Sequence, residues 1–155
     1  MIKANVITNN ASWYRFIKNP EYYIYRKINK LNSVNKNLMT NNIYFTLLLS
    51  GEKDIKNLNK KFRKKNKSTD VLSFPFYTKK ELKKKLLKEK DLYLGDIIIN
   101  LKKISKNKKL SNFKSKFDKL WVHGLIHLFG HDHKKEKDYL IMNKIEEKYI
   151  NLING

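Results

Sequence analysis

The four histidines of the chain all lie between positions 123 and 133, in the segment HGLIHLFGHDH. His123 and His127 are four residues apart, so on a helix they share one face with Cβ atoms about 5–6 Å apart, close enough to bind one metal ion. Gly130 allows the chain to turn after such a helix, so that His133 can complete the site. Three neutral imidazoles that leave a fourth position open are typical of a catalytic zinc site, in which the pKa of bound water falls to about 7.

This segment has two other interpretations. Histidines with ordinary hydrogen bonds in the core or on the surface are the better interpretation of one histidine, but not of three at this spacing. The spacing also equals the metzincin protease pattern H-E-x-x-H-x-x-G-x-x-H. Where a zinc protease has its general-base glutamate, this chain has Gly124, which has no side chain to accept a proton from water. Peptide hydrolysis by that mechanism is therefore disfavoured.

The chain contains no cysteine, which excludes a disulfide framework, thiolate zinc fingers and thiol nucleophiles. A metal ion must therefore be bound by histidine or carboxylate side chains. The carboxylates nearest the motifs are expected to cap turns or form pairs, and they are Asp70, Asp96 and Asp132. Orientation of a ligand imidazole by Asp132 is the alternative role for that residue. Met142 follows His133 by nine residues, and we expect it in the core rather than beneath a metal.

A rigid helix is needed to position the histidines, and apolar residues over positions 110–129 recur at helical spacing. From position 120 onward the segment is apolar almost all round, which predicts a central, buried helix. Earlier in the chain, Asn19 and Pro20 are typical of an N-cap and a first helical residue. We also expect a helix with Phe62 facing inward, a lysine-rich helix or mobile insert over 79–91 and a last amphipathic helix.

Four segments have the alternating or continuously apolar character of β-strands, and they are residues 2–8, 42–49, 69–74 and 92–100. Gly95 lies in the middle of the last one, where a glycine often marks a bulge or the close approach of a ligand. We therefore predict an α+β fold in which a small mixed β-sheet packs with helices and a central helix carries the three-histidine site. The length of 155 residues predicts that residues 1–155 form a single domain.

The chain has no segment typical of membrane insertion. Its first ten residues, MIKANVITNN, lack the apolar core of a signal peptide, and its longest apolar run, residues 43–49, is far shorter than the ~20 residues of a membrane span. We therefore expect a cytoplasmic protein without a membrane partner. The sequence leaves its oligomeric state open.

The charge is strongly basic, with 35 Lys and Arg against 14 Asp and Glu and a net charge of +21. A potential of this sign attracts polyanions such as nucleic acids. An A/T-rich coding sequence, which produces Lys, Asn and Ile without selection for charge, is the alternative origin. Tyr77 and Tyr93 are candidates to stack on unpaired bases, although core packing is the more common role of such residues.

Three ordered motifs, HGLIHLFGHDH, LNKKFRKKNKSTDVLSFP over residues 58–75 and LGDIII over residues 94–99, resemble the signatures of the YbeY family. Its members are bacterial single-strand-specific metallo-endoribonucleases that mature the 3′ end of small-subunit ribosomal RNA and take part in ribosome quality control. The resemblance implies zinc ligands at His123, His127 and His133, and a basic catalytic residue at Arg63 facing the metal cleft. It also implies single-stranded RNA, ribosomal RNA and the small ribosomal subunit as partners. Nickel and cobalt ions also suit imidazole ligands and are possible substitutes for zinc.

Two positions depart from the family signature. Ile126 replaces a leucine, which is harmless, and His131 replaces a tyrosine, which introduces a fourth possible ligand. Arg63 lies in a lysine-rich stretch and has a second interpretation as a solvated surface residue. Its guanidinium, one of only three in the chain, can however bind a phosphate through two hydrogen bonds where a lysine offers a point charge.

The resemblance leaves two questions of function open, namely the nucleophile and the class of protein. The nucleophile is either a metal-activated water or the 2′-hydroxyl of the substrate. The competing classes of protein are a metalloprotease, which Gly124 argues against, and an RNA-binding ribosome-assembly factor with a structural zinc, which an open three-ligand site argues against.

Overall fold

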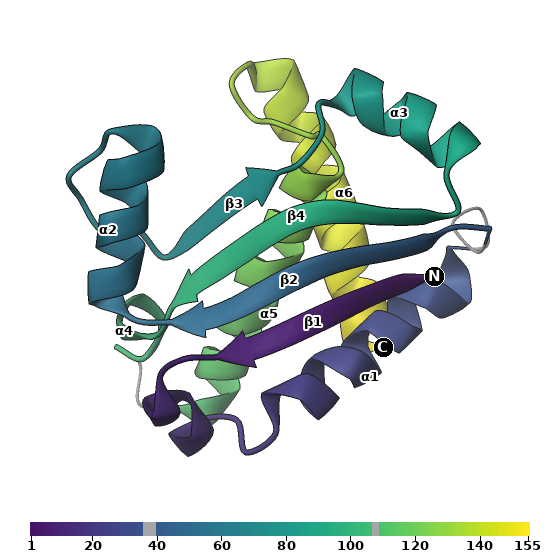
Figure 1. Cartoon of the computed structure of the whole chain (residues 1–155). Helices are drawn as coiled ribbons and strands as arrows, with labels where there is room; N and C mark the ends of the chain where they lie inside the picture. Colours follow the sequence, from purple (N-terminus) through teal and green to yellow (C-terminus); the bar gives the residue numbers. More distant parts are fainter. Residues whose placement is uncertain (36–39, 107–108) are drawn as a thin grey trace.

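The computed structural model describes residues 1–35, 40–106 and 109–155, and its centre is a four-stranded mixed sheet of order β1-β2-β4-β3 (Figure 1). The strands are β1 (Ile2–Thr8), β2 (Asn42–Ser50), β3 (Val71–Pro75) and β4 (Asp91–Asn100). β1, β2 and β4 are parallel neighbours, and β3 pairs antiparallel with β4 at the sheet edge. The helices are η1 (Ala11–Arg15), α1 (Pro20–Val34), α2 (Glu52–Arg63), α3 (Lys79–Lys88), α4 (Leu101–Ile104), α5 (Leu110–Leu128) and α6 (Glu136–Asn154). The predicted α+β fold is confirmed.

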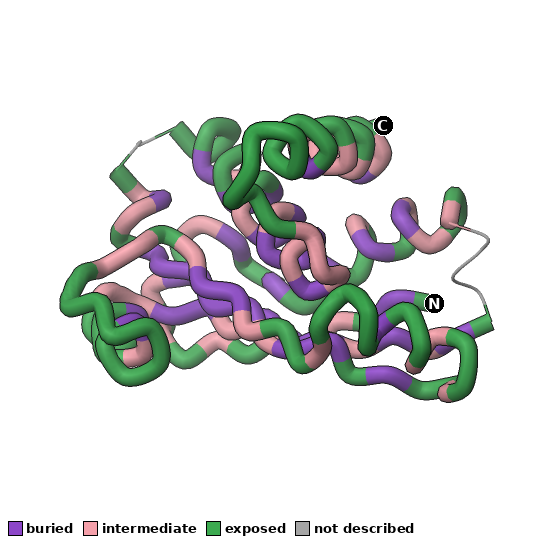
Figure 2. Tube along the Cα trace, turned by 90° about the horizontal axis from the view of Figure 1, so that it is seen from above, coloured by how far each residue is buried: buried purple, intermediate pink, exposed green. Residues whose placement is uncertain are grey.

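The main core lies between the sheet and the helices α1, α5 and α6, as the view from above in Figure 2 shows. Alternate residues of β2 point into it, and Phe45 and Leu47 are fully buried. From α5, Phe117 and Trp121 enter the same core, where Phe117 packs against the Trp13 ring of η1 at a centroid distance of 5.5 Å. This packing holds the predicted central helix α5 directly behind β3 and β4.

Gly124 allows α5 to approach β4 closely. A Cβ atom at this position would lie 2.7 Å from Cγ2 of Ile97, a distance that real Cβ atoms essentially never show. The residue that follows the first histidine of the motif is therefore buried against the sheet and has no room for a side chain. The glutamate that a zinc protease needs at this position would disrupt the helix–sheet contact.

Gly95 forms the bulge that the sequence predicted. The register of β2 and β4 shifts between Tyr44 and Thr46, opposite Gly95, whose φ of +135° is one that residues with side chains rarely adopt. A Cβ atom at Gly95 would lie 2.1 Å from the carbonyl oxygen of Phe74, so the glycine also lets β3 approach β4 closely. The predicted bulge is therefore present, and the close approach at this glycine is that of the neighbouring strand β3.

The start of the third strand and the orientation of Phe62 differ from the sequence-based predictions. The third strand begins at Val71 rather than at residue 69, because the Thr69 carbonyl accepts a hydrogen bond from the Asn100 side chain instead of joining the sheet. The prediction that Phe62 faces inward is wrong, since its side chain is 59% exposed. Helix α2 packs on the sheet through Ile55, and Phe62 lies at its far end beyond that contact.

The lysine-rich segment forms helix α3 rather than a mobile insert. Thr78 and Glu81 form a capping box, in which the Thr78 hydroxyl accepts from the Glu81 N–H and the Glu81 carboxylate accepts from the Thr78 N–H. Leu82 anchors the helix on the core with 3% exposure. Among the described residues, no helix is long and apolar enough to cross a membrane.

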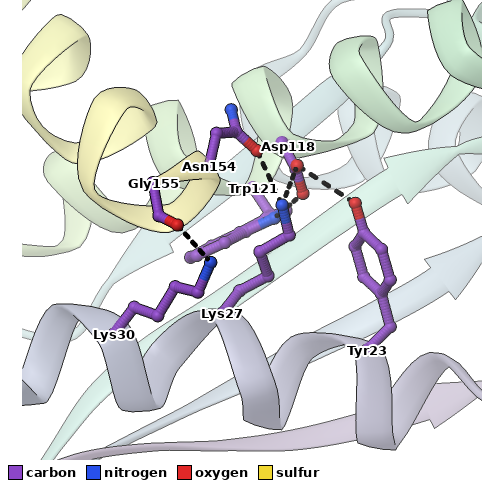
Figure 3. Close-up of polar contacts among 7 residues, drawn as sticks. All are labelled: Tyr23, Lys27, Lys30, Asp118, Trp121, Asn154 and Gly155. Atoms are coloured by element: carbon purple, nitrogen blue, oxygen red, sulfur yellow. Dashed lines mark hydrogen bonds and ion pairs between the residues drawn. The ribbon is translucent and has the colours of Figure 1, made fainter.

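A buried carboxylate ties α5 to α1 (Figure 3). Asp118 accepts hydrogen bonds from the Tyr23 hydroxyl and the Trp121 indole N–H, both at 3.0 Å, and its carboxylate lies 3.1 Å from Nζ of Lys27. Burial and the Asp118 charge raise the pKa of Tyr23 above its usual value, so this hydroxyl remains a donor. The Lys27 ammonium also donates to the side chain of Asn154, which connects α1 to the end of α6.

Candidate metal centre

The end of α5 turns the chain back toward the helix face that carries two of the histidines. The Gly130 N–H donates to the His127 carbonyl and the His131 N–H to the Ile126 carbonyl, the two hydrogen bonds of a Schellman motif. Gly130 has a φ of +90°, as this motif requires, and a Cβ atom there would lie 2.7 Å from Cβ of Lys79. The Asp132 carboxylate then accepts from the His133 N–H at 2.8 Å and fixes the turn.

This turn brings together the three histidines that the motif singled out. His123 and His127 lie on α5 and His133 in the loop before α6, and one nitrogen from each lies within 4.8 Å of the other two. The Nε2 atoms of His123 and His127 are 3.1 Å apart. Tetrahedral zinc with Zn–N bonds of about 2.0–2.1 Å separates its ligand nitrogens by about 3.3 Å, so the arrangement fits such an ion.

The other ring nitrogens of the two helical histidines have partners that fix the ring orientations. His123 Nδ1 lies 3.2 Å from the Glu146 carboxylate of α6, and His127 Nδ1 lies 2.8 Å from the His131 carbonyl. Contacts of this kind orient the imidazole ligands of metal sites in proteins. Burial, and to a lesser extent the nearby His123, lower the pKa of His127, which favours the neutral imidazole that a metal ion needs.

The remaining residues considered around the motif have structural roles. The side chain of His131 stands outside the group of three, and its backbone carbonyl contributes instead. Asp132 caps the turn, as expected, and Asp96 accepts a hydrogen bond from the Tyr93 hydroxyl. Asp70 accepts from the Thr69 hydroxyl, and Met142 is a core residue with 2% exposure.

Arg63 lies at the C-terminal end of α2 and reaches the cleft that contains the histidines. Its Nη2 donates to the Ser73 carbonyl at 3.0 Å, and its side chain is exposed. The cleft has a volume of about 700 Å³ and lies between β3 and the loop after α5, with His127 and His133 in its wall. Its cationic lining residues are Arg63, Lys65, Lys79 and Lys134. The structure thus places the predicted arginine and two of the three clustered histidines, His127 and His133, in the wall of one basic cleft.

Glu146 is the residue at this site that sequence reasoning missed. It comes from the last helix, 23 positions after the His123 that it contacts, and no motif spacing connects them. A weaker signal was present, because Glu146 lies one turn after the core residue Met142 and therefore on the inward face of the same helix. A carboxylate on that face needs a partner, and His123 provides it.

An α+β fold with a buried helix that presents histidines to a basic cleft defines a class of candidate metal-dependent enzymes. A model of the endoribonuclease YbeY family matches residues 9–154, and the chain belongs to this family of RNA-cleaving hydrolases. One relative named endoribonuclease YbeY, from Pelagibacter ubique, is 42% identical over 95% of this chain and 93% of its own length. Another, from Buchnera aphidicola of Schizaphis graminum, is 35% identical over 98% of this chain and 92% of its own length.

A solved structure has the same fold. The solution structure of a Thermotoga maritima protein superimposes with a TM-score of 0.60 and covers 99% of this chain and 89% of that protein. Its sequence is 23% identical, so the likeness concerns the fold alone.

Proposed function

We propose that the chain is a zinc-dependent endoribonuclease that cleaves single-stranded RNA, with His123, His127 and His133 as the metal ligands. The observation that carries this proposal is the convergence of three imidazole nitrogens within 4.8 Å beside a cleft lined by Arg63. A divalent ion bound there would supply Lewis-acid chemistry toward a phosphate oxygen or a water molecule. Imidazole ligands also suit nickel and cobalt, so these ions are expected to substitute.

The chain's own groups then act on the phosphate and on the ligands. In our proposal, Arg63 donates hydrogen bonds to the scissile phosphate and stabilises the charge that develops in the transition state. Its exposure on the cleft wall leaves the guanidinium accessible to a substrate. Glu146 and the His131 carbonyl hold the rings of His123 and His127, so these groups position ligands without touching the substrate.

The experiment uses the protein loaded with zinc and, in parallel, treated with a chelator. Single-stranded RNA, the same RNA in a duplex and casein are incubated with each form. We expect cleavage of the single strand alone, loss of cleavage with chelator and recovery on addition of zinc. Cleavage of casein would support the protease class instead, and cleavage of RNA in excess chelator would contradict metal dependence.

The ends of the RNA products identify the nucleophile. Attack by the 2′-hydroxyl of the substrate breaks the bond to the 5′-oxygen and leaves a 2′,3′-cyclic phosphate and a 5′-hydroxyl. Attack by water leaves a linear phosphate on one product end and a hydroxyl on the other. Replacement of the 2′-hydroxyl by hydrogen in the substrate blocks the first route and leaves the second.

The natural substrate we propose is the 3′ region of the small-subunit ribosomal RNA, with the small ribosomal subunit as a partner in the cytoplasm. Membership of the YbeY family and the basic cleft support this assignment. In a bacterial host depleted of its own family member, expression of this chain should restore the mature 3′ end of that RNA. His127→Ala is the control, and restoration by that variant would contradict the proposal.

A further inference from the structure

The outer face of the sheet, opposite α5, carries a row of aromatic side chains. Helix α2 packs on one end of this face through Ile55, Leu72 and Ile98. Beside that contact, Phe62, Phe76 and Tyr93 are exposed by 59%, 67% and 36%. Phe74 lies between them on β3 and is half-buried. We call the four residues Phe62, Phe74, Phe76 and Tyr93 the aromatic surface.

The aromatic surface is continuous with the proposed catalytic cleft. Phe76 lines that cleft and also meets the Tyr93 ring edge-on at a centroid distance of 5.9 Å. Phe74 meets the Phe62 ring at 5.5 Å, and the Arg63 guanidinium lies 5.9 Å from the Phe74 ring while it lines the cleft. Figure 1 shows β3, the strand of Phe74, at the edge of the sheet. A strand bound in the cleft therefore meets these rings on leaving it.

A hollow beside Phe62 and Phe74 extends the aromatic surface across the sheet. It has a volume of about 370 Å³, and its lining is mostly apolar and includes Leu48 and Leu58 as well as the two rings. Asp96 is the carboxylate in its wall, and it accepts a hydrogen bond from the Tyr93 hydroxyl, which in turn lies 2.6 Å from the Thr46 hydroxyl. These contacts hold the Tyr93 ring in a fixed orientation.

Cations lie next to the exposed rings. The Lys61 ammonium is 5.3 Å from the Phe62 centroid, Arg63 lies over Phe74, and the Lys3 ammonium is 5.6 Å from the ring of Tyr44 on the same sheet face. A protein partner with an apolar face would have to desolvate these charges at a cost. Single-stranded RNA offers base faces for the rings and phosphates for the cations.

We propose that the aromatic surface binds unpaired bases of the RNA strand that extends from the cleft, an inference that rests on the proposed function. The rings stack on bases, and Lys61 and Arg63 contact the adjoining phosphates. The bases of a duplex are stacked on one another and cannot present their faces to these rings. The surface thereby selects single strands before any chemistry occurs.

The test measures the affinity of the zinc-loaded protein for a fluorescently labelled single-stranded RNA whose scissile linkages lack the 2′-hydroxyl and are made resistant to hydrolysis. Phe62→Ala should weaken binding roughly 5-fold to 150-fold, the usual range for loss of one stacked base. Phe62→Trp should bind as the wild type does, and Phe62→Leu should bind as Phe62→Ala does, because stacking needs a π face and not only apolar area. Tyr25→Ala, at an aromatic residue on α1 that is 61% exposed, is the matched control and should bind normally.

A thermal melt of each variant shows that folding is intact, as the exposure of Phe62 leads us to expect. Wild-type affinity in Phe62→Ala, or in Phe62→Leu, would overturn this inference. If the wild type still cleaves single-stranded RNA in that case, the proposed function stands and only the aromatic surface fails. If the wild type neither binds nor cleaves RNA, the proposed function fails first.

Discussion

At the scale of single residues, His127 has a partner at each of its ring nitrogens in the proposed metal centre. Its Nε2 faces His123, and its Nδ1 contacts the His131 carbonyl. His127→Ala should lose the metal ion, whereas His131→Ala should retain it, because that variant keeps the backbone carbonyl and removes a side chain outside the group of three. Metal content of the purified proteins, one ion per chain in the wild type, is the measurement. Full occupancy in His127→Ala would contradict the ligand assignment.

In the proposed metal centre, we expect Glu146 to affect metal affinity through its contact with His123. Glu146→Gln keeps the shape of the side chain but removes the charge that supports the imidazole, and we expect zinc affinity to fall by about 10-fold to 100-fold. Competition with a chromophoric chelator measures this affinity directly. The neighbouring variant Glu147→Gln, at an exposed position, is the matched control and should bind zinc normally. Equal affinities in the two variants would show that the contact between Glu146 and His123 has no role in metal binding.

Variants of Arg63 distinguish an effect on the chemical step from an effect on folding. Arg63 is exposed, and its Nη2 donates to the Ser73 carbonyl, so Arg63→Ala should keep the zinc content and the melting temperature. Single-turnover cleavage should drop by roughly 10²-fold to 10³-fold, the usual effect of removing one charge-stabilising donor. Arg63→Lys should recover only part of the rate, because an ammonium cannot form the two parallel hydrogen bonds of a guanidinium. Arg26→Ala, at an exposed arginine on α1, is the control.

A loss of rate in Arg63→Ala that comes with lost zinc or a lower melting temperature would assign the arginine a structural role. Its interpretation as a solvated surface residue predicts a normal rate instead. Either result would leave the histidine cluster as the only group with a proposed catalytic role.

At the scale of elements, the contact between α1 and α5 depends on the buried Asp118. Asp118→Ala leaves the Trp121 indole N–H without its acceptor and Lys27 without its counter-ion, and it should lower the free energy of unfolding by about 3 kcal/mol. This is the lower end of the usual range, because Lys27, with a side chain 17% exposed, can still reach water. Tyr23→Phe should cost about 1.5 kcal/mol, and Tyr22→Phe, at a residue 58% exposed on the same helix, should cost nothing measurable. Denaturant unfolding curves give all three values.

The same elements show which features the sequence could and could not predict. The positions of α5 and β2 follow from apolar periodicity, and the turn after α5 follows from Gly130, because both signals are local. The prediction that Phe62 faces inward was wrong, because helical spacing does not reveal where the sheet beneath a helix ends.

The partners of the site residues could not be predicted, because they come from distant parts of the chain. Glu146 contacts His123 from another helix, and the carbonyl of Ser73 on β3 accepts a hydrogen bond from Arg63. These contacts exist only after the sheet and helices have packed. The histidine cluster was predictable for the opposite reason, since all of its members lie within eleven consecutive residues.

At the scale of the whole molecule, the net charge of +21 has two explanations with different consequences. If the lysines only reflect base composition, most of them have no role at the RNA interface. If they bind phosphates, the cations around the cleft should contribute more than those elsewhere. Lys65 and Lys134 line the cleft, whereas the exposed Lys137 and Lys144 lie on α6 outside that lining.

RNA affinity should therefore fall steeply with salt, because each phosphate contact releases counterions. For single strands the slope of log K against log salt concentration is about −0.7 per contact, so five contacts reduce affinity roughly 10²-fold between 50 and 200 mM salt. The double variant Lys65→Ala/Lys134→Ala should make the slope shallower by about 1.4, and Lys137→Ala/Lys144→Ala should leave it unchanged. Binding isotherms of a single-stranded RNA at several salt concentrations provide the slopes. Equal slopes in the two double variants would show that long-range charge, rather than lysines at the cleft, attracts the RNA. A wild-type affinity that does not change with salt would show that the excess charge has no role in binding.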